Sequence, residues 1–237
     1  MQVRSRRGFL AGAAAIAAAS SVGACTRRGE RGDLLDASAS AELPAAAESL
    51  AADGTTIVLG DPGAALAVRL YEDPSCPACE EFETQGTGPY LKRAARNGGL
   101  QLQFTLGSFL GPGSKHAVNA LRAALDQGRF AEHHDVLYRH QASARKGGGF
   151  TQDRLLALAV LVEGLRGPEF DAAVQETTHR QFVEASDEAL GASVKGTPTM
   201  AINGTVVPTE NQALYTDRSR LYRYLRARTG GEDRGPR

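Results

Sequence analysis

The sequence predicts an α/β fold in which an all-helical block interrupts a sheet. Three observations predict it. Short apolar or alternating runs typical of strands occur before residue 107 and again after residue 193. Between them, residues 114–192 follow a helical period throughout. A Cys76-Pro77-Ala78-Cys79 motif stands directly after an apolar strand, at the start of a predicted helix.

Length and charge limit the architecture and the partners. The chain has 237 residues, which fits one domain with an insertion or two small domains. Its 27 basic residues balance 27 acidic ones, so nothing points to a nucleic-acid partner.

The N-terminus is typical of a targeting signal rather than of a folded element. Residues 1–24 have the form of an export signal peptide, and Ser5-Arg6-Arg7-Gly8-Phe9-Leu10 resembles a twin-arginine signal. Val22-Gly23-Ala24-Cys25 resembles a lipobox, which makes Cys25 the expected lipidation site. A short transmembrane anchor is the alternative, but the apolar run falls short of the ~20 residues that a span needs. Residues 25–53 are expected to be a flexible tether, with a short helix at about residues 45–52.

The first strands lead to the cysteines. Residues 55–59 and 65–71 read as strands, and Asp73-Pro74 as the turn that follows the second one. Ser75 is the expected N-cap of the next helix, and Pro77 fits its first position. This helix is predicted to run to Asn97 with a break at residues 86–89, and residues 100–106 form the next strand.

Five helices are expected within residues 114–192. A break at residues 147–149 separates the second from the third, and Pro168 opens the fourth. All the histidines fall in this block and are expected to be exposed or to cap helices: His116, His133, His134, His140 and His179. Beyond it, residues 194–202 and 205–207 are predicted to form a hairpin around Asn203-Gly204. A last amphipathic helix is expected over residues 214–228, with its arginines solvated, and residues 229–237 are expected to be a disordered tail.

The two cysteines of the motif point to thiol chemistry. A helix N-terminus favours the Cys76 thiolate over the thiol, and the thiolate is the species that attacks disulfides. A zinc site is the alternative, but it needs two more ligands, and Cys25 is the only other cysteine. A disulfide across two residues closes a small loop and stabilises a fold little, so reaction is the better interpretation of the pair.

The order of elements is that of a thioredoxin fold with an inserted all-helical subdomain. Gly60-Asp61-Pro62-Gly63-Ala64, Glu72 to Cys79 and Gly196-Thr197-Pro198-Thr199 together resemble the DsbA-like disulfide oxidoreductase family. The resemblance covers residues 54–228, with the helical insertion at about 114–192.

The resemblance implies roles for individual residues. Cys76 would be the exposed nucleophile and Cys79 the resolving thiol, with Pro77 and Ala78 tuning the pair. Thr197-Pro198 matches the family's cis-proline loop, whose backbone faces the thiols and can pair with an extended substrate.

Two departures from the family pattern concern the proton and the thiolate. Leu70 stands where some members carry a buried acid, and Ala78 where the best-known oxidant has histidine. Four acids lie nearby in the sequence, but they are expected to be solvated charges of the turn and the helix start: Glu72, Asp73, Glu80 and Glu81. The sequence therefore does not identify the group that gives or takes the proton of Cys79.

The sequence thus predicts a lipid-anchored extracytoplasmic thiol–disulfide oxidoreductase that forms or isomerises disulfides in exported proteins. An anchored reductase and a non-catalytic module that binds metal or a partner are the alternatives. The expected partners are exported polypeptides with cysteines, a redox partner that resets the pair, and the membrane through Cys25. No cofactor and no metal are expected beyond the Cys76–Cys79 disulfide itself.

Overall fold

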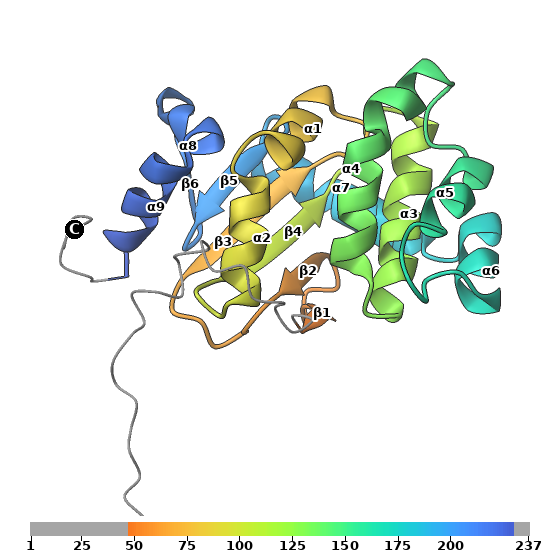
Figure 1. Cartoon of the computed structure of the whole chain (residues 1–237), viewed down its shortest axis with the longest axis horizontal. Helices are drawn as coiled ribbons and strands as arrows, with labels where there is room; N and C mark the ends of the chain where they lie inside the picture. Colours follow the sequence, from red (N-terminus) through yellow and green to blue (C-terminus); the bar gives the residue numbers. More distant parts are fainter. Residues whose placement is uncertain (1–46, 230–237) are drawn as a thin grey trace, which may run out of the picture.

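A computed structural model of the chain describes residues 47–229 (Figure 1). The predictions for the signal peptide, for Cys25, for residues 25–46 and for residues 230–237 lie outside the described residues.

A mixed sheet forms the centre of the fold. Its strand order is β1 (Glu48–Leu50), β2 (Thr56–Leu59), β4 (Gln101–Leu106), β3 (Ala67–Glu72), β5 (Thr199–Ile202) and β6 (Thr205–Val206). β3 and β4 are parallel, and the other neighbouring pairs are antiparallel. A parallel pair requires a crossover connection, which α1 (Pro77–Thr84) and α2 (Gly88–Arg96) supply. The crossover places the start of α1 at the carboxyl end of β3.

The predicted break between α1 and α2 is confirmed. A Cβ on Gly86 would lie 2.5 Å from the carbonyl oxygen of Tyr215, so a larger residue does not fit there. That same carbonyl accepts a hydrogen bond of 2.9 Å from the backbone N–H of Thr87. The break thus ties the crossover to the C-terminal part of the fold.

The helical block is present as predicted. It comprises α3 (Pro112–Asp126), α4 (Phe130–Lys146), α5 (Gln152–Ala159), α6 (Pro168–Glu176) and α7 (Arg180–Ser193). In Figure 1, α3 to α6 gather at one end of the sheet, whereas α8 (Ala213–Thr216) and α9 (Arg218–Arg226) lie at the other. One hydrophobic cluster runs through sheet and block alike, so the insertion shares the core of the sheet.

The N-terminal boundary was predicted wrongly. Residues 48–50 form β1, which pairs with β2 from Glu48↔Leu59 to Leu50↔Ile57, instead of a helix or a tether. The alanine-rich composition favours a helix locally, but three residues gain more by completing the ladder of β2. The folded part of the chain therefore begins before residue 54.

The C-terminal region is partly as predicted. The hairpin turns at Asn203 and Gly204, whose φ values are 48° and 79°. The prediction of a single last helix was wrong, because Asp217 leaves the helical conformation (φ −107°, ψ 103°). Its side chain instead caps α9 by accepting a hydrogen bond from the N–H of Arg220. A short 3₁₀ turn, Thr209–Asn211, precedes α8.

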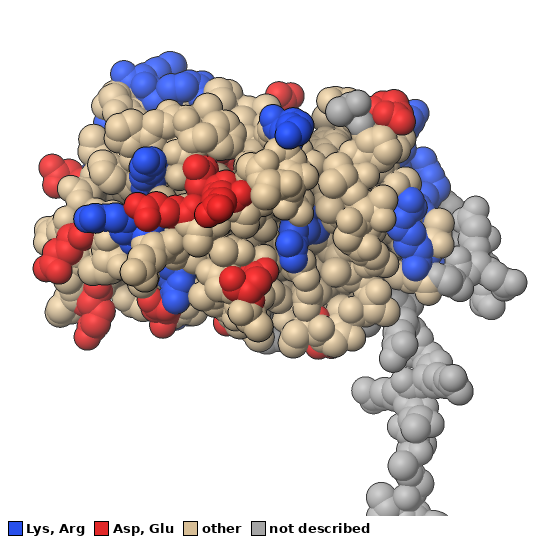
Figure 2. Space-filling view, turned by 180° about the vertical axis from the view of Figure 1, so that it is seen from behind, with Lys and Arg blue, Asp and Glu red and all other residues tan. Residues whose placement is uncertain are grey.

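The surface carries both signs of charge. On the face shown in Figure 2, acidic and basic side chains intermingle, and basic side chains collect at the end that carries α9. Arg218, Arg220, Arg223 and Arg228 are exposed, as the solvated arginine face predicted. Within residues 47–229, no helix combines the length and the apolar character needed to cross a membrane.

Candidate active site

Cys76 begins helix α1. It is the N-cap residue, with φ −76° and ψ 119°, and Pro77 takes the first helical position as predicted. The prediction of Ser75 as the N-cap was wrong by one residue. The Asp73 carboxylate explains the shift, because its Oδ1 accepts from the N–H of Ser75 at 2.8 Å and from the hydroxyl of Ser114 at 2.7 Å. This turn delivers the Cys76 sulfur to the helix N-terminus.

The two thiols of the motif differ in access and in acidity. Both are free thiols here; Cys76 is 8% exposed and Cys79 is 0% exposed. A hydrogen bond from the Cys79 thiol, aided by Thr197 and by the N–H groups of Cys79 and Ala78, lowers the pKa of Cys76 to about 5 despite its burial. Burial, followed by the bond to Cys76 and the charge of Glu72, raises the pKa of Cys79. A thiolate therefore forms on Cys76 first.

The loop before β5 faces the nucleophile. The peptide bond between Thr197 and Pro198 is cis, as predicted. The Cys76 thiol donates a hydrogen bond of 3.4 Å to the carbonyl oxygen of Thr197. Pro77 and Ala78 are exposed next to it. The structure thus brings together the six predicted site residues of the motif and the loop: Cys76, Pro77, Ala78, Cys79, Thr197 and Pro198.

The prediction of solvated acids was wrong for Glu72 and Asp73. Both are 0% exposed, whereas Glu80 is half-buried and Glu81 is exposed. Glu72 lies two residues beyond Leu70 on β3 and therefore on the same face of the strand. β3 accordingly carries an acid on that face, at a position nearer to Cys76 along the chain than Leu70.

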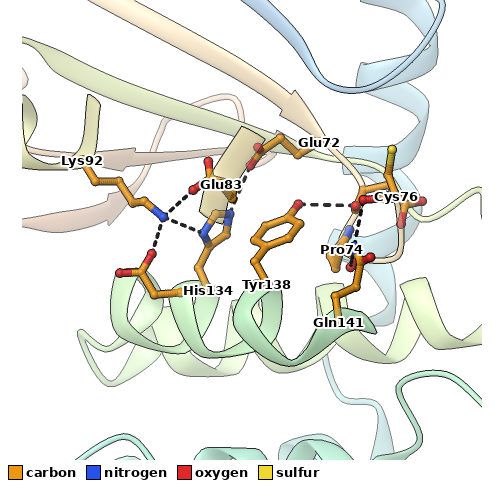
Figure 3. Close-up of polar contacts among 10 residues, drawn as sticks. Glu72, Pro74, Cys76, Glu83, Lys92, His134, Tyr138 and Gln141 are labelled. Carbon is orange, nitrogen blue, oxygen red and sulfur yellow. Dashed lines mark hydrogen bonds and ion pairs between the residues drawn. The ribbon is translucent and has the colours of Figure 1, made fainter. Parts of the chain in front are cut away.

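A buried group of charges surrounds Glu72 (Figure 3). The Lys92 ammonium lies 2.5 Å from Oε2 of Glu83 and also pairs with Asp135. Nδ1 of His134 lies 3.5 Å from the same ammonium, and Nε2 of His134 lies 3.1 Å from Oε2 of Glu72. Although burial opposes its charge, the carboxylates of Glu83 and Asp135 raise the pKa of Lys92. Lys92 is therefore a fixed cation.

The fixed cation determines the tautomer of His134. Lys92 can only donate, so Nδ1 of His134 must accept, and the ring hydrogen resides on Nε2. Nε2 then donates to Oε2 of Glu72. Burial, followed by Lys92, lowers the pKa of His134, which keeps the ring neutral.

Glu72 is the acid of this group whose protonated form its surroundings favour. Burial and the neighbouring Glu83 raise its pKa well above the usual range. Oε1 of Glu72 and Oε1 of Glu83 are buried without a hydrogen-bond donor from another residue, whereas Oε2 of Glu83 has the Lys92 ammonium beside it. One proton between the two carboxyl groups satisfies this arrangement, because a protonated Glu72 can donate to Glu83.

Three of these side chains also have the spacing of a metal site. Ligand atoms of Glu72, Glu83 and His134 lie within 4.8 Å of one another. The ammonium of Lys92, however, already lies against Glu83 and beside His134 and supplies a positive charge there. The donor set is thus better explained by the lysine than by an ion.

The prediction of exposed or capping histidines was wrong for His133 and His134, which are 0% exposed. Neither ring nitrogen of His133 has a hydrogen-bond partner, and its ring packs edge-on against Phe170 at 5.6 Å. His116 and His140 are half-buried, and His179 is the N-cap residue of α7, where it pairs with Asp126 at 3.3 Å.

Comparisons with known proteins agree with this geometry. The family model described as thioredoxin matches residues 52–217. The chain belongs to the thioredoxin family. The predicted fold class is confirmed: a thioredoxin fold with a helical insertion. A comparison with curated protein sequences gave no match.

Several solved structures have a similar fold. Oxidised BdbD from Bacillus subtilis has a TM-score of 0.64 at 21% identity, over 78% of this chain and 99% of that one. MdbA from Actinomyces oris, a thiol-disulfide oxidoreductase, has a TM-score of 0.60 at 21% identity, over 76% and 89%. The reduced form of the disulfide bond oxidoreductase DsbG from Mycobacterium tuberculosis has a TM-score of 0.58 at 23% identity, over 73% and 83%.

Proposed function

We propose that this DsbA-like chain is a lipid-anchored extracytoplasmic thiol–disulfide oxidoreductase that forms or isomerises disulfides in exported proteins. One observation carries the proposal: the pKa of Cys76 is lowered to about 5, while that of the fully buried Cys79 is raised. This asymmetry gives one thiol the nucleophilic and leaving-group role and gives the other the resolving role. The reaction uses the Cys76–Cys79 disulfide and no bound cofactor.

The oxidising reaction proceeds in two exchanges. A substrate thiolate attacks Sγ of Cys76, so that a mixed disulfide forms and Cys79 leaves as a thiolate. Because the pKa of Cys79 is high, this thiolate takes up a proton. A second substrate thiolate then attacks the substrate sulfur of the mixed disulfide, and Cys76 leaves as a stable thiolate. The substrate loses two electrons to the cysteine pair, and a separate redox partner must remove them.

Glu72 is the proposed proton donor to Cys79 in this reaction. It is fully buried, burial raises its pKa, and its ionised form is close enough to raise the pKa of Cys79. Protonation of Cys79 leaves Glu72 ionised beside the His134 N–H and the Lys92 cation. The proton then returns from solvent after product release.

The direction of electron flow follows from the thiolate. Only the reduced protein contains the Cys76 thiolate, so its stabilisation raises the reduction potential of the pair. Ala78 stands where the strongest oxidants have histidine. We therefore propose a potential between those of thioredoxin and DsbA, about −270 and about −120 mV.

Turnover tests the proposal. The oxidised domain over residues 47–229 is mixed with a reduced peptide that contains two cysteines, with a glutathione buffer to reset the pair. Repeated formation of peptide disulfide, lost in Cys76→Ser, is expected. A chain that oxidises no peptide and whose thiols become reactive only after addition of a chelator would be a metal-binding module instead. A chain that reduces peptides but does not oxidise them would be a reductase.

The anchored location follows from the N-terminal signal in the sequence. Export through residues 1–24 and a lipid on Cys25 would hold the domain outside the cytoplasmic membrane, where disulfides persist. Its substrates there would be exported polypeptides with cysteines, bound as an extended chain beside Thr197.

A further inference from the structure

Helix α4 of the insertion presents a polar stripe to the segment that leads into the cysteines (Figure 3). His134, Tyr138 and Gln141 are spaced four and three residues apart, so they lie on one face of the helix. Along this stripe, His134 contacts Glu72, the hydroxyl of Tyr138 donates to the carbonyl of Asp73 at 3.4 Å, and Gln141 reaches Pro74 and Cys76. Each step along the helix thus meets a later residue of the active-site segment.

Gln141 makes the closest contacts of the stripe with the nucleophile. Its Nε2 donates to the carbonyl oxygens of Pro74 at 2.9 Å and of Cys76 at 2.8 Å. Gln141 is buried, with 1% of its surface exposed. Both amide hydrogens are therefore used on the two sides of Ser75.

The amide has only one possible orientation. Its Oε1 accepts from the guanidinium of Arg145 at 2.9 Å, one turn further along α4. Arginine can only donate and backbone carbonyls can only accept, so exchanging the oxygen and the nitrogen would break all three bonds. Arg145 in turn reaches Glu80 in the first turn of α1, at 3.4 Å. These contacts form a closed loop: Gln141 of α4 binds Cys76 at the start of α1, and Arg145 of α4 links Gln141 to Glu80 of α1.

We propose that Gln141 is a positioning residue for the Cys76 nucleophile. By holding the backbone on both sides of Ser75, it fixes the point at which the Cys76 side chain leaves the chain, and so keeps the sulfur against the N–H groups that start α1. The carbonyl of Cys76 also accepts from the N–H of Glu80 at 3.1 Å, so Gln141 acts on the peptide group that opens the helix. The inference rests on the proposed function, in which Cys76 is the reacting thiol.

The test replaces the amide and follows the Cys76 thiolate. Gln141→Met keeps the length of the side chain and removes both donors. Gln152→Met is the matched control, because Nε2 of Gln152 also donates to two carbonyls, those of Val174 at 2.9 Å and Gln175 at 2.8 Å. The thiolate absorbance of the reduced domain is titrated from pH 3 to 8, and the melting temperature is measured alongside.

We expect Gln141→Met to raise the pKa of Cys76 by about one unit, which lowers the ratio of thiolate to thiol about tenfold below the pKa. Gln152→Met should leave that pKa at the wild-type value. If both variants melt lower but neither moves the pKa of Cys76, Gln141 is only structural and the proposal is overturned.

A second pair of variants covers a Gln141→Met chain that does not fold. Arg145→Met frees Oε1 of the amide at a partly exposed position, and Arg139→Met removes the same charge from an exposed position of α4. A rise in the pKa of Cys76 in Arg145→Met, beyond any in Arg139→Met, supports the proposal, and equal values overturn it. These readouts need no turnover, so they remain valid even if the wild-type chain fails the oxidation assay.

Discussion

Sγ of Cys76 and the carbonyl oxygen of Thr197 lie 3.4 Å apart, although 121 residues separate them in the sequence. The nucleophile of the crossover helix is therefore covered by the loop that follows the helical insertion. A substrate chain that pairs with the backbone of Thr197 brings its sulfur to Cys76 and not to the deeper Cys79.

The difference in access predicts which cysteine captures substrates. In Cys79→Ser, Cys76 can attack a substrate disulfide but nothing resolves the product, so mixed disulfides should accumulate. In Cys76→Ser, the remaining thiol is 0% exposed and should trap at least tenfold less. Mass spectrometry of adducts with a disulfide peptide measures both, and equal trapping would mean that the roles are misassigned.

The lowered pKa of Cys76 predicts a pH-dependent stability of the reduced form. The pKa is about 5 in the fold and about 8.5 in an unfolded chain, so the stabilisation is complete above about pH 8.5 and is lost as the pH falls through about 5. The oxidised form has no such contribution. The dithiol form should melt above the disulfide form at pH 7, with a gap that narrows toward pH 4.

Calorimetry of both redox forms over this range measures the gap. A dithiol form that melts well below the disulfide form at pH 7 would contradict the oxidant direction and favour a reductase.

The raised pKa of Glu72 predicts a kinetic effect without a large structural one. Glu72→Gln mimics the neutral carboxyl in shape but cannot give up a proton. The single-turnover oxidation of a dithiol peptide should slow by roughly 100-fold, within the usual range for a general acid. Glu81→Gln, which alters an exposed acid of α1, is the control. An unchanged rate in Glu72→Gln, measured by stopped flow, would assign the proton to another group.

The unpartnered ring of His133 predicts a stabilising substitution. Both nitrogens are buried without partners, and burial lowers its pKa to about 3. His133→Leu should raise the free energy of unfolding by about 1–3 kcal/mol at pH 8. Because the unfolded chain binds a proton between pH 6.5 and about 3 and the folded chain does not, the gain should grow on acidification. Urea unfolding at pH 8 and pH 5 checks this, and a gain that shrinks at pH 5 would contradict the cause.

The N-terminal signal predicts the route of export. Arg6→Lys together with Arg7→Lys should abolish export of the full chain, and Cys25→Ala should release soluble protein or leave the precursor unprocessed. Cell fractionation with an antibody against the domain distinguishes these outcomes. Normal export of the arginine variant would indicate the general secretory route.

The sequence was sufficient for the parts of the site that are local. Cys76 and Pro77 define the start of α1 by their own conformational preferences, and Asn203-Gly204 defines the hairpin in the same way. The burial of Glu72 could not be predicted from such local preferences. At the end of a strand before Asp73-Pro74 it resembles a turn residue, and its burial comes from α4, with His134 lying 62 residues further along the chain.

A signal for this burial did exist in α4. His134, Tyr138 and Gln141 share the helix face that packs on the sheet, where polar side chains need partners. Such a stripe indicates a buried polar network, but it does not name the acid that completes it. The prediction for residues 48–50 was wrong for the same physical reason. These three residues form a strand only because β2 offers a free edge to pair with.

Glu48 gives helix α4 a mechanical role. Its two carboxylate oxygens accept from the N–H groups of Phe130 and Ala131 at 2.7 and 2.8 Å, so the first described strand is fastened to the first turn of α4. Further along the same helix, ~16 Å from Phe130 at 1.5 Å per residue, Gln141 binds the peptide group of Cys76. Tension on the chain from its N-terminal side therefore loads β1 and Glu48 first, and α4 passes what remains along its axis toward the thiols. The N-terminal lipid anchor proposed for this chain would therefore pull on β1 and on the helix that also contacts the peptide group of Cys76.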